Sequence, residues 1–231
     1  MTDIGSADIS WIDAAVRQRL RDVPLLVGNP SLSYAAMLRS ALRHVEAIGS
    51  PQLLGIASTL ADLRVLLPDS AADVLVVTTS QLRDGCSIPL LKEWLERPEP
   101  PALLVLLQQD DPPLPLVELV GLPRVAIVSD GSLGYGGLLR AVECLQAGQT
   151  YVDPEAQQRI HEAQAVVALL TERERHVLAL LAEGLTNRQI ASRIVVAEVT
   201  ARDHVQRILR KLELPDRNAA AALALRLGLY I

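Results

Sequence analysis

The stretch that decides the fold starts at Leu170 and reads LTERERHVLALLAEGLTNRQIA as far as Ala191; after a short turn it continues as TARDHVQRILRKL from Thr200 to Leu212. Thr171 and Glu174 have the spacing of a capping box, which predicts a helix beginning there. Gly184 predicts its end, because glycine readily adopts the left-handed conformation that closes helices. We expect helices over 171–182, 187–193, 200–212 and 217–227 and no strand in this part of the chain.

Four helices in so short a segment, with a short second helix and a basic third one, predict a helix-turn-helix domain. A helix fits the DNA major groove if its outward side chains are long and polar and its inward ones pack on the helices behind. In the third helix we expect an inward row of Val205, Ile208, Leu209 and Leu212 and an outward row of Arg202, Asp203, Gln206, Arg207 and Arg210.

These two segments resemble the DNA-binding domain of LuxR/NarL-type regulators over nearly all of residues 169–231. The resemblance implies a third helix in the major groove and a fourth helix that helps to form a homodimer. Carried over by position, it implies base contacts from Arg202, Asp203 and Gln206 and phosphate contacts from Thr186, Thr200, Arg207, Arg210 and Lys211. The apolar fourth helix offers Ala219, Ala222, Leu223 and Leu227 for the dimer contact.

Two positions depart from the family pattern. Asp203 is an acid in the expected base-reading row, where phosphates repel it unless it accepts from a cytosine amino group. Ala197 stands where the family often has Ser at the start of the helix. His204 has no cluster of Cys, His or carboxylate residues around it in the sequence, so we interpret it as a structural or phosphate-contacting residue, not as a metal ligand.

Charge and composition also indicate that the C-terminal part of the chain is the part that binds DNA. The chain has a net charge of −5, yet residues 186–211 carry six basic and two acidic side chains, so only the C-terminal part is suited to a polyanion. Two cysteines, Cys86 and Cys144, indicate no disulfide framework and no zinc spacing. With a polar start and no long apolar run, we expect a cytoplasmic protein without membrane contact.

Ahead of this domain, short apolar runs alternate with amphipathic stretches. We expect strands at 24–27, 53–57, 74–77, 103–107 and 125–128, and helices at 34–45, 88–95, 116–120 and 137–146, which predicts a parallel α/β sheet. With LLRAVECLQAGQTYVDP at 138–154, this order resembles the receiver (flavodoxin-like) domain. We therefore divide the chain into a helical extension (1–22), a receiver-like domain (23–147), a linker helix (148–168) and the helix-turn-helix domain (169–231).

The resemblance implies a phosphoacceptor aspartate, two acids that hold Mg²⁺, a hydroxyl and a lysine at the strand ends. At the matching positions this chain has Gly28 and Asn29, Thr78, Gln108 and Ser129. Metal-dependent phosphorylation is therefore not expected. Asp110, Asp111 and Asp130 leave open a relocated metal site, and the glycines of 131–137 leave open an anion-binding loop; polar and flexible loops are the alternative to both.

We thus expect a DNA-binding transcription regulator that works without phosphorylation, cofactor or metal. Its receiver-like domain would sense a regulatory protein or small ligand, or serve for dimerisation. The alternative is a protein-interaction adaptor that has lost most DNA affinity. An enzyme is not expected, because no nucleophile–base pair is visible.

Overall fold

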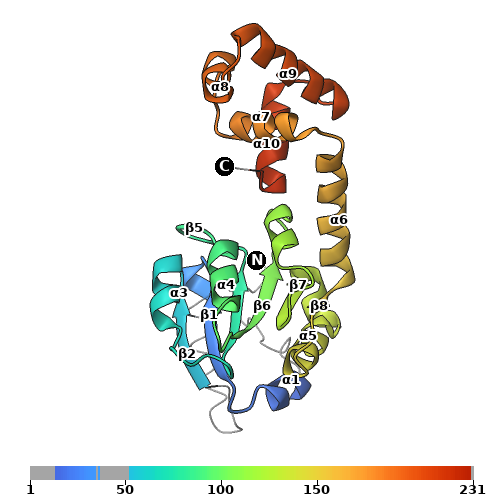
Figure 1. Cartoon of the computed structure of the whole chain (residues 1–231). Helices are drawn as coiled ribbons and strands as arrows, with labels where there is room; N and C mark the ends of the chain where they lie inside the picture. Colours follow the sequence, from blue (N-terminus) through green and yellow to red (C-terminus); the bar gives the residue numbers. More distant parts are fainter. Residues whose placement is uncertain (1–13, 35, 37–51, 230–231) are drawn as a thin grey trace, which may run out of the picture. The chain divides into compact units, whose positions relative to one another are not determined.

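The computed structural model describes residues 14–34, 36 and 52–229 (Figure 1). By its internal contacts the chain divides into two compact units, one of residues 1–109 and 118–156 and the other of residues 110–117 and 157–231. The expected α/β domain followed by an all-α helix-turn-helix domain is confirmed. The domain boundaries at 22, 147 and 168 remain predictions. No helix among the described residues has the length and apolarity that crossing a membrane requires.

The first unit is built on one six-stranded sheet in which every neighbouring pair is parallel. Its central strands are buried on both faces because they consist almost wholly of Leu, Val, Ile and Ala. The order in the sheet is β2-β1-β3-β6-β7-β8. The strands are β1 (Pro24–Gly28), β2 (Gln52–Ala57), β3 (Leu75–Thr79), β6 (Ala102–Leu107), β7 (Val125–Ser129) and β8 (Tyr151–Val152).

Helices cover both faces of this sheet (Figure 1). Alternate strand residues such as Val27 and Leu104 pack with Val16 of α1 and Val142 of α5 in one apolar cluster. Residues of the opposite parity, such as Leu26 and Leu103, point to the other face, where Figure 1 shows α3 and α4. The helices of this unit are α1 (Ala14–Arg19), α3 (Leu60–Leu66), α4 (Ile88–Leu95), α5 (Gly137–Gln146) and the 3₁₀ helix η4 (Asp130–Tyr135). Another 3₁₀ helix, η3 (Leu114–Glu118), falls almost wholly within the second unit.

Several elements differ from the sequence-based expectation. Helix α3 and a small hairpin, β4 (Gln81–Leu82) with β5 (Gly85–Cys86), were not anticipated. The helix expected at 116–120 is a 3₁₀ turn, consistent with the prolines before it, which restrict the backbone. Residues 151–152, assigned to the linker helix, pair with β7 as an edge strand. Most of the expected helix over 34–45 and the start of the helical extension expected over 1–22 lie outside the described residues.

The second unit is helical, and side-chain caps mark the starts of α7, α8 and α10. Capping boxes at Thr171 and Thr186 open α7 and α8, and Asp216 caps α10 through two backbone N–H groups. Gly228 closes α10 in the left-handed conformation. The helices are α6 (Pro154–Ala168), which starts in the first unit, α7 (Glu172–Ala182), α8 (Asn187–Ile194), α9 (Glu198–Lys211) and α10 (Arg217–Leu227).

Candidate nucleic-acid interface

Helix α9 presents a polar ridge to solvent because its other side forms part of the core. Ala201, Val205 and Ile208 are buried at spacings of four and three residues. Asp203 and Gln206 each precede a buried residue by two positions, about 200° around the helix, so they lie opposite the core. The expected contact residues on this helix are all exposed: Thr200, Arg202, Asp203, Gln206, Arg207 and Arg210.

The turn before α9 holds an unusual backbone conformation. Val195 has a φ of 56°, although a β-branched residue rarely adopts the left-handed region, and its side chain is 88% exposed. The Arg173 guanidinium donates to the Ile194 carbonyl and so holds the end of α8. Ala197, at the start of α9, provides no side-chain cap, in contrast to the first residues of α7, α8 and α10. The first N–H groups of α9 therefore have no capping side chain and suit a phosphate oxygen.

Lys211, expected at a phosphate, also has a structural partner. Its ammonium nitrogen lies 2.6 Å from Oε2 of Glu174, whose side chain is almost fully buried. Burial works to raise the pKa of Glu174, but hydrogen bonds from Lys211 and from the backbone N–H and hydroxyl of Thr171 outweigh it and lower the pKa to about 2. The pair ties the last turn of α9 to the first turn of α7.

Thr186 also has a structural role that the sequence reasoning did not assign to it. It is exposed, and its hydroxyl accepts from the Gln189 backbone N–H as the N-cap of α8. Two buried polar atoms of this unit, Nδ1 of His204 and Oδ1 of Asn187, have no hydrogen-bond partner in the structure.

Helix α10 exposes part of the expected dimer contact. Ala222 is exposed, Ala219 and Leu223 are half-buried, and Leu227 is buried. Leu225, which the sequence reasoning did not single out, is 53% exposed. The apolar surface that α10 offers to solvent therefore lies around Ala222 and Leu225, while Leu227 packs inside its own chain.

The five positions that the resemblance matches to a receiver's phosphorylation site lie at the carboxyl end of adjacent strands. Gly28 pairs with Thr78, and a Cβ at Gly28 would stand 2.4 Å from the Thr78 hydroxyl. Thr78 is 1% exposed, and its hydroxyl donates to the Thr79 carbonyl. Asn29 is buried as well and accepts from the Ser31 N–H. Gln108 lies exposed beyond the end of β6.

Ser129, the fifth of these positions, is fully buried and binds the residues that open α6. Its backbone N–H donates to Asp153, and its hydroxyl lies 3.2 Å from that carboxylate and 3.0 Å from Oε2 of Glu155. Asp153 also accepts from the Ala156 N–H at the start of the helix. The position where a receiver carries a lysine is thus occupied by a serine bonded to acids.

The relocated metal site that the sequence left open gains no support. Among the residues that the structure describes, no three His, Cys, Asp or Glu side chains are grouped as metal ligands would be. The Asp130 carboxylate accepts from the N–H groups of Gln109 and Gly131. It therefore serves to hold the loop after β7.

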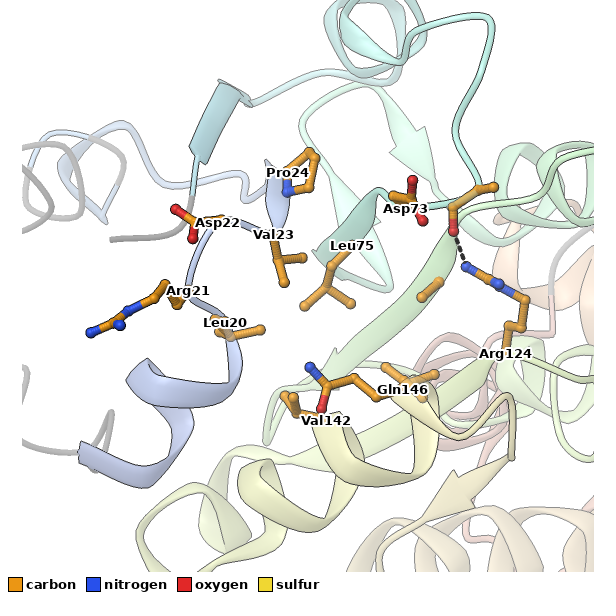
Figure 2. A pocket seen from close by; sticks show the side chains of 13 residues that line it. Leu20, Arg21, Asp22, Val23, Pro24, Asp73, Leu75, Arg124, Val142 and Gln146 are labelled. Carbon is orange, nitrogen blue, oxygen red and sulfur yellow. Dashed lines mark hydrogen bonds between the residues drawn. The ribbon is translucent and has the colours of Figure 1, made fainter. Parts of the chain in front are cut away.

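A pocket of about 500 Å³ opens at the opposite, amino end of the sheet. Figure 2 shows apolar side chains such as Leu75 and Val142 on its wall and the polar groups of Asp22, Asp73 and Arg124 around it. Asp22 and Arg124 both have a φ of 61°. The Arg124 guanidinium donates to the Ala72 carbonyl, while its Nε is buried without a partner.

An α/β receiver-like unit followed by a helix-turn-helix unit with an exposed polar ridge defines a class: DNA-binding transcription regulators of the response-regulator type. Comparison with known proteins agrees. Residues 168–224 match the family model for bacterial regulatory proteins of the luxR family. The chain is 32% identical over 193 residues to the DNA-binding transcriptional activator DevR/DosR of Mycobacterium tuberculosis, covering 79% of this chain and 88% of that one.

The chain belongs to the LuxR family of bacterial regulatory proteins, among its response regulators. It is also 44% identical over 62 residues to the transcriptional regulatory protein LnrK of Bacillus subtilis, over 27% of this chain and 28% of that one. RcsB of Salmonella enterica serovar Typhimurium, solved bound to the promoter P1flhDC, has the same fold, with a TM-score of 0.58, 19% identity and coverage of 89% and 99%. These relatives are regulators of transcription, not enzymes.

Proposed function

We propose that this regulator binds duplex DNA as a homodimer through α9 and does so without phosphorylation of its receiver-like domain. One observation carries the proposal. Arg202, Gln206 and Arg210 are exposed on α9, while the side of the helix that carries Ala201, Val205 and Ile208 is buried in the core. A rigid helix with long polar side chains on its outer side is what the major groove admits. Binding to chromosomal DNA would take place in the cytoplasm.

The residues divide by chemistry into those that read bases and those that hold phosphates. Arg202 and Gln206 pair with guanine and adenine, and Asp203 accepts from a cytosine amino group. Thr200, Arg207 and Arg210 contact phosphates, together with the uncapped N–H groups at the start of α9. Thr186 and Lys211 remain candidates for phosphate contacts beside their roles in capping and in the ion pair with Glu174.

The test is selection of bound duplexes from a random pool, followed by titration of the selected half-site at several salt concentrations. With about three to five phosphates neutralised per protomer, affinity falls steeply as salt rises. Arg207→Ala weakens all sequences alike and lowers the salt dependence, whereas Arg202→Ala relaxes the preference at one base pair. If the variant that carries both Arg202→Ala and Arg207→Ala binds duplex DNA as well as the wild type does, the proposed docking of α9 is wrong.

For the input we favour a small ligand in the pocket at the amino end of the sheet. Its apolar wall suits the body of a small molecule, and the groups of Asp73 and Arg124 suit one polar end. Two residues held at positive φ line it, which costs stability and is common at binding sites. A screen of small molecules for a rise in the melting temperature would identify a ligand, and Arg124→Ala should abolish that rise. Arg97→Ala, which lies outside the pocket, is the control and should keep it.

The alternative, an interaction adaptor with little DNA affinity, rests on Asp203 and on the acidic character of the first unit. The same selection decides between them. An adaptor enriches no sequence from the pool at physiological salt.

A further inference from the structure

Val199 is an apolar side chain exposed in the part of α9 that faces outward. It is 59% exposed and lies in the first turn of the helix. It precedes Asp203 by four residues and Gln206 by seven, so the three side chains follow one another along a single ridge. It also precedes the buried Ala201 by two positions, about 200° around the helix, and so points away from the core.

Among the described residues of the second unit, Val199 does not belong to the apolar core. The helix core is complete without it, since Ala201, Val205 and Ile208 supply the buried row. Its neighbours on the ridge are polar, as solvent exposure demands. A valine in this place gains free energy only when another molecule removes it from water.

The major groove offers one prominent apolar group, the C5-methyl of thymine. The N-terminal residues of a recognition helix are those that approach base edges most closely. One turn separates Val199 from Asp203, a rise of about 6 Å. Since base pairs are stacked about 3.4 Å apart, the two side chains reach base pairs that are at most about two steps apart.

We infer that Val199 selects a thymine by packing on its methyl group, within two base pairs of the one that Asp203 contacts. The inference rests on the proposed docking of α9 in the major groove. It adds a recognition element that forms no hydrogen bond. It predicts that each half-site contains a thymine whose C5-methyl group contributes to the binding affinity.

The experiment removes the C5-methyl group from the DNA and the two γ-methyl groups of Val199 from the protein in turn. In the selected half-site, each thymine is replaced singly by deoxyuridine, which lacks only the C5-methyl. With the wild-type chain, one such replacement should weaken binding about three- to fivefold, the equivalent of one methylene-sized group left in water, about 0.8 kcal/mol. With Val199→Ala, the same replacement should have almost no effect.

Val195→Ala serves as the matched control, because it shortens a valine that is also exposed but precedes α9. It should leave the deoxyuridine effect intact, and Val199→Thr, which keeps one methyl group, should retain part of it. A methyl effect that persists in Val199→Ala, or no methyl effect in the wild type, overturns the inference while leaving sequence-specific binding established. Failure of the wild type to select any sequence overturns the proposed function instead.

Discussion

At the scale of single residues, Glu174 shows how a buried carboxylate can remain ionised when its hydrogen bonds and ion pair outweigh the cost of burial. Its carboxylate is stripped of water, yet it accepts from the Thr171 N–H and the Thr171 hydroxyl and pairs with Lys211 at 2.6 Å. These contacts favour the charged form more than burial disfavours it, so the pKa falls to about 2.

This lowered pKa predicts an acid-sensitive helical unit. The folded pKa lies below the ordinary value of 4.5, so the stabilisation is present above about pH 4.5 and is lost as the pH falls towards 2. It amounts to about 3 kcal/mol at neutral pH. Urea unfolding of residues 157–231 should show this slope between pH 5 and pH 2.5, and Glu174→Gln should flatten it. An equal slope in that variant would assign the effect to other carboxylates.

The same pair changes how a substitution of Lys211 must be interpreted. Lys211→Met leaves a buried carboxylate unpaired and should cost about 3 kcal/mol of unfolding free energy. Arg210→Ala, one residue earlier and exposed, should leave stability within about 0.5 kcal/mol and weaken DNA binding. Denaturation and DNA titration of both variants separate the two roles; equal stability of Lys211→Met and the wild type would mean that the ion pair is not formed in solution.

With α9 docked as proposed, the Asp203 carboxylate is expected to oppose binding to phosphates wherever it does not meet a cytosine. Asp203→Asn should therefore raise affinity for random duplex DNA severalfold and reduce discrimination at the base pair it contacts. Competition between the selected half-site and random DNA measures both quantities. If neither changes, Asp203 only faces solvent.

At the scale of elements, some apolar residues of α10 pack in the core of their own chain and others are exposed to solvent. Ala220, Ala224 and Leu227 are buried within the chain, whereas Ala222 and Leu225 are exposed. An exposed leucine beside small side chains allows two copies of the helix to approach closely, as a two-fold dimer on two half-sites needs.

Leu225→Asp should accordingly abolish cooperative binding to paired half-sites while leaving the affinity for one half-site almost unchanged. Leu227→Ala provides the contrast: it should lower the free energy of unfolding by about 2–3 kcal/mol, because it opens a cavity in the core. Gel-shift titrations on single and paired half-sites distinguish these effects. Cooperativity that survives Leu225→Asp would locate the dimer contact on another element.

At the scale of the whole molecule, the first unit has a receiver-like sheet, and the positions matched to a phosphorylation site carry neither an acid nor a lysine. The hydroxyl of Thr78 is buried and already hydrogen-bonded, and Gly28 and Asn29 provide no carboxylate for Mg²⁺. Ser129, in place of a lysine, is bonded to Asp153 and Glu155 at the start of α6.

Incubation with acetyl phosphate and Mg²⁺ should therefore leave both the intact mass and the DNA affinity unchanged. Without a carboxylate nucleophile or a metal, the charge that develops on the phosphoryl group is not neutralised. A catalytically competent receiver protein treated in parallel controls for the reagent. A stable gain of one phosphoryl group that alters DNA affinity would contradict the proposal.

The sequence by itself determined the elements whose signals are local. The bounds of α4, α5 and α10 agree with the prediction, because apolar spacing, Pro89, Gly137 and Gly228 lie within or next to each helix. The helix-turn-helix arrangement and the outward row of α9 followed from the same periodicity. The sheet followed from alternating apolar runs, which a parallel sheet buried on both faces requires.

Only the tertiary structure decided what depends on partners distant in the chain. The partnership of Lys211 with Glu174 spans 37 residues, and that of Ser129 with Glu155 spans 26; neither leaves a periodic signal. Strand β8 is too short to show alternation and exists because β7 offers it a free edge. Likewise, the sequence could not divide the apolar residues of α10, since burial of Leu227 and exposure of Leu225 depend on what packs against each side of the helix.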